Sequence, residues 1–114
     1  MRVIQTAFWL VCAAVTVASL SPTEYLLPGV FDWWDKAQHA IAFAGLCFCG
    51  LWAYPNRVLA MLVGLLLLGA VIEVAQAATG WRVGDVADWV ADAVGVGLAY
   101  GFFRACALTR SRAV

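Results

Sequence analysis

Four apolar runs divide this chain, and their length limits what it can fold into. They span roughly residues 4–20, 36–54, 58–78 and 86–103. Each run approaches or reaches the ~20 residues that a helix needs to cross ~30 Å of hydrocarbon. A chain of 114 residues with four such elements is too short to close a transmembrane barrel, so helices are the expected structure. We predict an all-α fold, a four-transmembrane-helix bundle that forms a single domain over residues 1–114.

The composition supports a membrane location. The chain is 65% hydrophobic and 12% charged, whereas soluble domains average about 45–50% apolar and about 25% charged residues. Its mean hydropathy is +0.89. The formal net charge is zero, which excludes the clustered basic surface of a nucleic-acid-binding protein. These values indicate an integral membrane protein with no nucleic-acid partner.

Prolines, glycines and polar residues separate the runs. Residues 54–57, YPNR, predict a tight turn between helices, and two glycines in residues 79–85, TGWRVGD, are expected to end the third helix. The first run has the outline of a secretory signal peptide. A short loop leads from it straight into another apolar run, so we expect an uncleaved first helix.

The distribution of basic residues predicts the orientation. With four spans, the N-terminus, the turn near residue 57 and the C-terminus share one side of the membrane. Five basic residues lie on that side, namely Arg2, Arg57, Arg104, Arg110 and Arg112. Two basic residues, Lys36 and Arg82, lie on the other. The positive-inside rule therefore predicts that both termini are cytoplasmic and that the other end of the bundle is extracytoplasmic.

Polar residues interrupt three of the runs at the same, outer end of the predicted bundle. They are Asp35, Lys36 and His39 in the second run, Glu73 and Gln76 in the third, and Arg82, Asp85, Asp88 and Asp92 at the start of the fourth. Asp35 and His39 are four residues apart, and the last four are spaced three, three and four apart, so each set shares one helix face. An acid near the bilayer centre costs about 2.5–3.5 kcal/mol. We therefore expect these side chains to point into the bundle and toward one another.

Such a cluster has four interpretations, and the residues alone leave all four open. It can be a catalytic site, with His39 or a carboxylate as the base and Arg82 holding an anionic group. It can be a structural network in which Arg82 and Lys36 pair with the acids. It can be a proton or ion pathway, or a metal site built from His39, Glu73 and Asp88. The sequence has no compact metal motif, so we expect neither a metal nor another cofactor.

Small residues in the fourth run predict close helix packing. Gly95 with Ala99, and Gly97 with Gly101, are pairs of small residues four apart, which let a neighbouring helix approach closely. Such pairs can also support a homodimer.

Three sequence blocks resemble the VanZ-like family of small membrane proteins. They are DKAQH at residues 35–39, EVAQ at residues 73–76, and RVGDVADWVADAVGVGLAYG from residue 82 to 101. Two positions depart from the family pattern: Asp92 stands where the family often has Asn, and Asp85 stands where it commonly has a small polar residue. The resemblance implies a multi-pass protein of the bacterial inner (cytoplasmic) membrane. It also implies a link to the cell envelope and, for some members, to glycopeptide antibiotic resistance, without a settled reaction.

Our hypothesis is an outward-facing polar site that acts on a membrane lipid or a lipid-linked envelope precursor, as a hydrolase or transferase of the headgroup. His39, oriented by Asp35, or Glu73 would transfer the proton, and Lys36 and Arg82 would hold phosphate. The predicted catalytic residues are Asp35, His39, Glu73 and Asp88, and the predicted substrate-binding residues are Lys36, Gln76, Arg82, Asp85 and Asp92. The alternative is a non-catalytic protein that binds an envelope lipid or scaffolds a membrane complex. A small transporter is a weaker third class, because four spans leave little room for alternating access.

Overall fold

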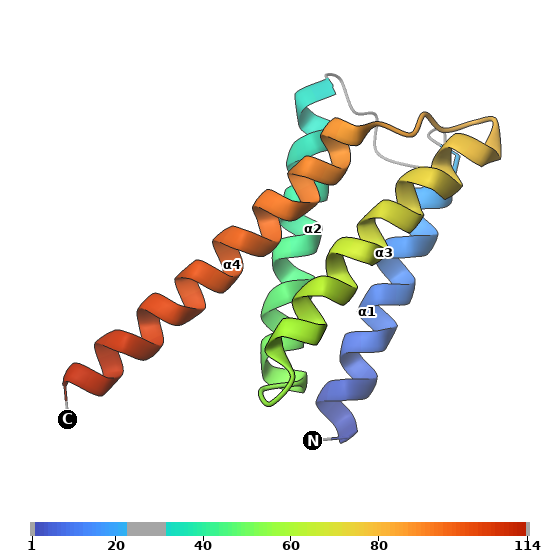
Figure 1. The fold of residues 1–114 in the computed structure, drawn as a ribbon. Coiled ribbons are helices and arrows are strands. Elements are labelled where there is room, and N and C mark those ends of the chain that lie inside the picture. Colours follow the sequence, from blue (N-terminus) through green and yellow to red (C-terminus); the bar gives the residue numbers. More distant parts are fainter. Residues whose placement is uncertain (1, 23–31, 114) are drawn as a thin grey trace.

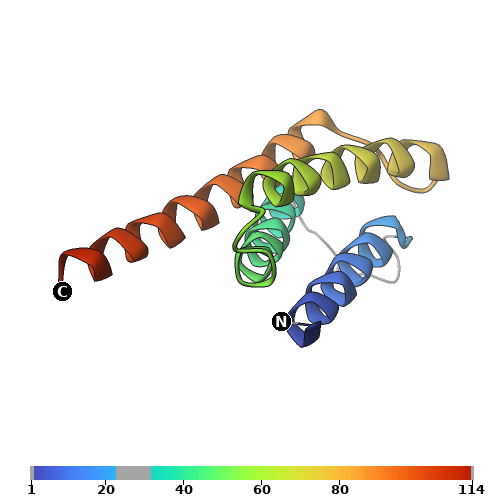
Figure 2. The same cartoon turned by 60° about the horizontal axis from the view of Figure 1, so that its bottom comes forward.

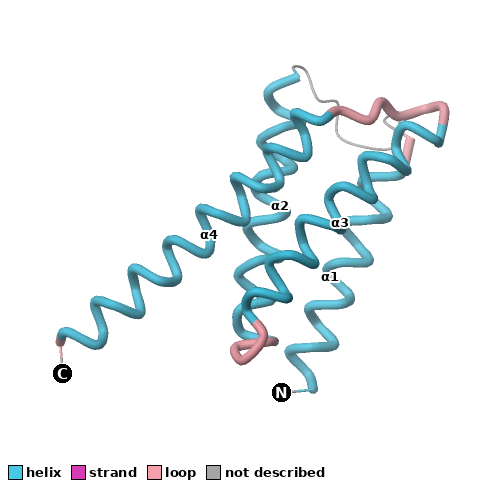
Figure 3. Tube along the Cα trace, in the orientation of Figure 1, coloured by secondary structure: helices cyan, strands magenta, loops and turns pink. Residues whose placement is uncertain are grey.

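The described part of the chain, residues 2–22 and 32–113 of a computed structural model, forms four helices (Figures 1 and 3). The helices are α1 (Arg2–Leu20), α2 (Asp32–Ala53), α3 (Val58–Thr79) and α4 (Val86–Arg112). These residues contain no strand. The prediction of an all-α helical bundle is confirmed.

Three of these helices, α1, α3 and α4, are long and apolar enough to cross a membrane. Large apolar side chains on their outward faces are exposed, for example Leu59, Leu67 and Leu98. Apolar surface this extensive is rare on soluble monomers. The chain is therefore a helical membrane protein.

Helix α2 has a different place in the bundle. It is 22 residues long, begins with polar residues, and packs against α1, α3 and α4. Several of its apolar side chains, among them Phe43, Leu46 and Cys47, are completely or almost completely buried. Because protein surrounds α2 on several sides, this helix can carry polar groups that face other helices rather than lipid.

Two helix boundaries differ from the predicted spans by four residues or more. Helix α2 begins four residues earlier than the second apolar run, and α4 continues to Arg112, well beyond the end of the fourth run near residue 103. An apolar run indicates which residues can contact hydrocarbon. A helix ends where its backbone hydrogen bonds end, so it can extend beyond the run. Arg110 and Arg112 in the last turn also interact favourably with the helix dipole. This C-terminal part of α4 extends away from the other helices (Figures 1 and 2).

The tightest crossing in the bundle joins α2 and α4. A Cβ placed on Gly95 would collide with the backbone carbonyl of Ala40, and both Gly95 and Ala99 are buried. Gly97 and Gly101 have no atom within 4 Å of an added Cβ. The first small-residue pair is therefore a packing surface within the chain, and a homodimer through the second pair stays a prediction.

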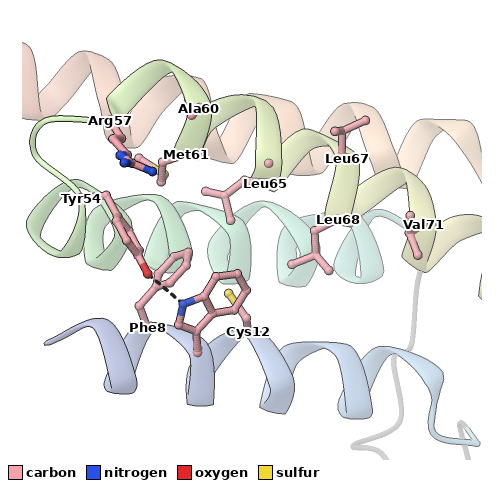
Figure 4. Close-up of a pocket in the computed structure, with 12 residues that line it drawn as sticks. Phe8, Cys12, Tyr54, Arg57, Ala60, Met61, Leu65, Leu67, Leu68 and Val71 are labelled. Atoms are coloured by element: carbon pink, nitrogen blue, oxygen red, sulfur yellow. Dashed lines mark hydrogen bonds between the residues drawn. The ribbon is translucent and has the colours of Figure 1, made fainter. Parts of the chain in front are cut away.

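An apolar groove separates α1 from α3 (Figure 4). Its volume is about 480 Å³, and Phe8, Leu65 and Leu68 are among the side chains that line it. At one end, the Trp9 indole N–H donates a hydrogen bond of 2.8 Å to the Tyr54 hydroxyl.

The crossing of α2 and α4 can be tested with two matched substitutions. Gly95→Ala should lower the free energy of unfolding by about 1–3 kcal/mol, because the new methyl group overpacks a contact with backbone. Gly97→Ala adds the same methyl group in open space, and should be neutral or stabilise the helix by up to about 1 kcal/mol. Unfolding of the purified protein in detergent micelles measures both values. Equal effects of the two substitutions would contradict the crossing.

Candidate functional site

The only histidine of the chain lies at the centre of a buried polar cluster. Its Nδ1 atom, on α2, is 2.8 Å from Oδ1 of Asp92 on α4 and 3.8 Å from Oε1 of Glu73 on α3. Its Nε2 atom is 3.8 Å from Oδ2 of Asp88, also on α4. All four side chains are at least nine-tenths buried. The structure therefore brings His39, Glu73, Asp88 and Asp92 together from three helices, at the end of the bundle where α2 begins and α3 ends.

The start of α4 places its two buried acids. Asp85 is the N-cap residue, and its side chain accepts a hydrogen bond of 2.8 Å from the backbone N–H of Ala87. This is a preferred role of aspartate, because it satisfies one of the unpaired N–H groups at the helix start. Asp88 and Asp92 follow four residues apart and are both buried.

The prediction that Arg82 and Asp85 belong to one helical stripe with Asp88 and Asp92 is wrong. Helix α4 begins only at Val86, and Arg82 lies in the connection that follows α3. Gly80 ends α3 with a left-handed backbone conformation, φ 81°, so the chain leaves the helix before Arg82.

The connection between α3 and α4 folds back against Glu73. A Cβ on Gly84 would lie 2.5 Å from the backbone carbonyl oxygen of Glu73, so a side chain there would hold the two segments apart. The backbone N–H of Asp85 donates a hydrogen bond of 2.9 Å to Oε2 of Glu73. One carboxylate oxygen of Glu73 is thereby held, and the other lies on the His39 side.

Lys36 lies at the partly exposed edge of the cluster. Its ammonium group is 3.2 Å from Oδ2 of Asp85 and 3.1 Å from Oδ1 of Asp88. The N–H of Ala87 and, after it, the ammonium of Lys36 hold the pKa of Asp85 below its usual range. Lys36 therefore pairs with two acids, as one interpretation of the sequence expected.

The other predicted site residues have different surroundings. Asp35 forms no hydrogen bond or ion pair with His39 among the contacts of the described residues, and the partner of His39 is Asp92. Gln76 is completely buried and donates a hydrogen bond of 2.8 Å to the carbonyl oxygen of Ser19, which links α3 to α1. No carboxylate in the described part of the chain pairs with the guanidinium of Arg82.

The partner of His39 is Asp92 rather than the predicted Asp35. The prediction of Asp35 follows from its place one turn before His39 on the same helix. The signal for Asp92 was available in Gly95, three residues further along α4, because a glycine at a close crossing marks the helix face that meets α2.

Three buried side-chain oxygens of the described residues have no hydrogen-bond partner: Oε1 of Glu73, Oδ2 of Asp92 and Oε1 of Gln76. Unsatisfied buried polar atoms are uncommon in native proteins, and each calls for an explanation. Two of these oxygens belong to the acids that meet Nδ1 of His39. Chemically, this arrangement can exchange a proton between histidine and carboxylate, or bind a positively charged ligand.

Comparison of the chain with protein families, curated proteins and solved structures finds no match. The resemblance to the VanZ-like family therefore depends on the three sequence blocks alone.

A double-mutant cycle distinguishes the two candidate partners of His39. The substitutions His39→Gln and Asp92→Asn should be coupled by about 0.5–3 kcal/mol in the free energy of unfolding, because the two side chains are in direct contact. His39→Gln and Asp35→Asn should be additive within about 0.5 kcal/mol. Unfolding in detergent micelles measures both cycles. A larger coupling to Asp35 than to Asp92 would overturn the assignment.

Proposed function

We propose that this chain is a VanZ-like enzyme of the bacterial cytoplasmic membrane, and that the His39 cluster acts on a lipid-linked component of the cell envelope. The observation that carries the proposal is the burial of one histidine among three carboxylates from two other helices. Apolar residues of similar volume are often as stabilising as buried ionic groups, or more so. A chain that needed this interface only for packing would not require four ionisable groups there.

The geometry supports His39 as the group that transfers a proton. Asp92 holds Nδ1 at 2.8 Å and so fixes the direction of the ring. Nε2 lies 3.8 Å from Asp88, beyond hydrogen-bond distance, so this nitrogen can accept a proton from a water molecule or a substrate hydroxyl. Oε1 of Glu73 is the second candidate base, since it has no hydrogen-bond partner.

The position of the cluster supports a lipid headgroup as the substrate. Glu73 lies six residues before the end of α3, about 9 Å along the helix axis, which is a depth that a headgroup can reach. The guanidinium of Arg82 has no carboxylate partner in the described residues, so it can hold a phosphate. Apolar outer faces and the groove between α1 and α3 offer surfaces for acyl or prenyl chains. Hydrolysis or transfer of the headgroup is the reaction class that we propose.

A second candidate, a non-catalytic protein that binds an envelope lipid or scaffolds a complex, also has an observation in its favour. Lys36 is already paired with Asp85 and Asp88, and Gln76 is used to join α3 to α1. Lys36 and Gln76 therefore have structural roles, whether or not His39 and its acids are catalytic.

Lipid analysis separates the two candidates. Cells that express the wild type should differ by at least one envelope lipid species, present or absent, from cells that express His39→Gln or Glu73→Gln. The neutral, similarly sized replacements remove proton transfer while keeping the volume of the site. Gln38→Ala, at an exposed position next to His39, is the control and should behave as the wild type does. Mass spectrometry of lipid extracts measures the difference. Identical lipids in all strains at equal expression would reject the enzyme and favour the binding protein.

The proposed orientation has its own test. Alkaline phosphatase folds to an active form only outside the cytoplasm, so its fusion to the C-terminus should be inactive, whereas a fluorescent-protein fusion at the same point should be bright. The reason is the excess of arginines at the end of the bundle that carries both termini. An active phosphatase fusion would place the His39 cluster on the cytoplasmic side.

A further inference from the structure

The geometry points to a binding site for a divalent transition-metal ion, of which Zn²⁺ is the example to test, formed by His39, Glu73 and Asp92. One ligand atom from each of these three residues lies within 4.8 Å of the others. Zinc binds nitrogen at about 2.0–2.1 Å and carboxylate oxygen at about 2.0–2.2 Å in a tetrahedral geometry, which places neighbouring ligand atoms about 3.3 Å apart. The observed separations of 2.8 Å between His39 and Asp92 and of 3.8 Å between His39 and Glu73 lie on either side of that value. Small side-chain rotations would therefore suffice to surround one ion.

The unpartnered oxygens are an independent observation in favour of a ligand. Oε1 of Glu73 and Oδ2 of Asp92 are buried without a hydrogen-bond partner, and their side chains are 10% and 0% exposed. Both residues meet the same nitrogen, Nδ1 of His39. A cation bound beside Nδ1 would give Oε1 of Glu73 a partner, and it would also give one to Oδ2 of Asp92 where this carboxylate binds with both oxygens.

The charges of the cluster favour a cation as well. Lys36 is paired with Asp85 and Asp88, so its charge is not directed at Glu73 or Asp92. Two buried carboxylates then face one imidazole. Buried charges in proteins are generally paired or coordinate metals, and a divalent ion would balance both acids.

The groups around the three ligands hold them in place. The backbone N–H of Asp85 binds Oε2 of Glu73 and leaves Oε1 for an ion. Asp88 lies 3.8 Å from Nε2 of His39, on the side where metal-bound histidines usually have a carboxylate or carbonyl partner. One imidazole and two carboxylates form a ligand set that suits zinc, and three protein ligands leave a position open for water or substrate.

This inference rests on the site of the proposed function and adds a cofactor to it. With an ion on Nδ1, His39 acts as a ligand, and Asp88 becomes the residue placed to accept a proton. The three residues differ from the set His39, Glu73 and Asp88 considered from the sequence, because Asp92 rather than Asp88 contacts Nδ1.

The test is equilibrium binding of Zn²⁺ to the full chain in detergent after treatment with a chelator. The wild type should bind about one zinc ion per chain. His39→Gln and Asp92→Asn should each bind at least about tenfold more weakly, since loss of even an outer-shell partner typically costs 10–100-fold in metal affinity. Asp35→Asn, which removes a carboxylate from the same helix but not from the ligand set, should bind as the wild type does. No zinc binding by the wild type, or equal binding by all four proteins, would overturn the site.

X-ray absorption on the zinc-loaded wild type keeps the test decisive if a variant fails to fold. The expected ligand shell contains one imidazole nitrogen and oxygens at about 2.0–2.2 Å. Sulfur ligands, or a shell without imidazole, would overturn the assignment.

The lipid comparison distinguishes this inference from the proposed function. Zinc binding at His39 together with unchanged lipids would support the metal site and reject the enzyme. A lipid change catalysed equally well by the chelator-treated, metal-free protein would support the enzyme and overturn the metal as its cofactor.

Discussion

The burial of charge inside an apolar bundle is the constraint on which the rest of this structure depends. Glu73, Asp88 and Asp92 cannot face hydrocarbon without a large cost, and the one histidine of the chain is their common neighbour. Three helices must therefore present particular faces to one another at the same level. The close crossing of α2 and α4 at Gly95 permits this arrangement, because a larger residue would push α4 away from the backbone of Ala40.

The polar cluster is partly exposed on one side and is bordered by buried apolar side chains on the other. On the exposed edge, Lys36 and Asp85 form an ion pair. Deeper in the bundle, Phe43, Ile72 and Val96 are buried on the three helices that carry the cluster. In this low-dielectric setting an interaction between charges is stronger than in water, and an unpaired charge is more costly. The same environment that makes His39 and its acids costly to bury strengthens the interaction of the carboxylates with a proton or another positive charge.

Hydropathy was sufficient to predict the helices and the end of the bundle at which the polar residues lie. It was insufficient to predict which side chains contact one another. The runs that end near Leu20 and begin at Val58 and Val86 match helix boundaries closely, because proline, glycine and polar residues separate them. The C-terminal end of α4 was missed because an amphipathic or polar helix leaves no apolar run.

The pairing of His39 depends on how α2 and α4 are rotated against each other. Gly95 marks the face of α4 that meets α2, but residue spacing along α2 alone does not give this rotation. Spacing along one helix suggested Asp35, which lies at the partly exposed helix start where water competes for its oxygens. The buried Asp92 on α4 is the partner in the structure. Similarly, the three-residue spacing of Arg82 and Asp85 suggested one continuous helix, whereas Gly80 and the N-cap at Asp85 place a non-helical connection there.

The most direct test of the central claim, that His39 meets an acid from another helix, is a solid-state NMR experiment on the protein in lipid bilayers. Because the chain has one histidine, ¹⁵N-histidine labels a single side chain. With ¹³C-labelled aspartate, a nitrogen–carbon correlation should join Nδ1 of His39 to one carboxyl carbon. We expect that signal to persist in Asp35→Asn and to be lost from the carboxylate region in Asp92→Asn. A signal that disappears in Asp35→Asn instead, or no correlation at all in the wild type, would contradict the account.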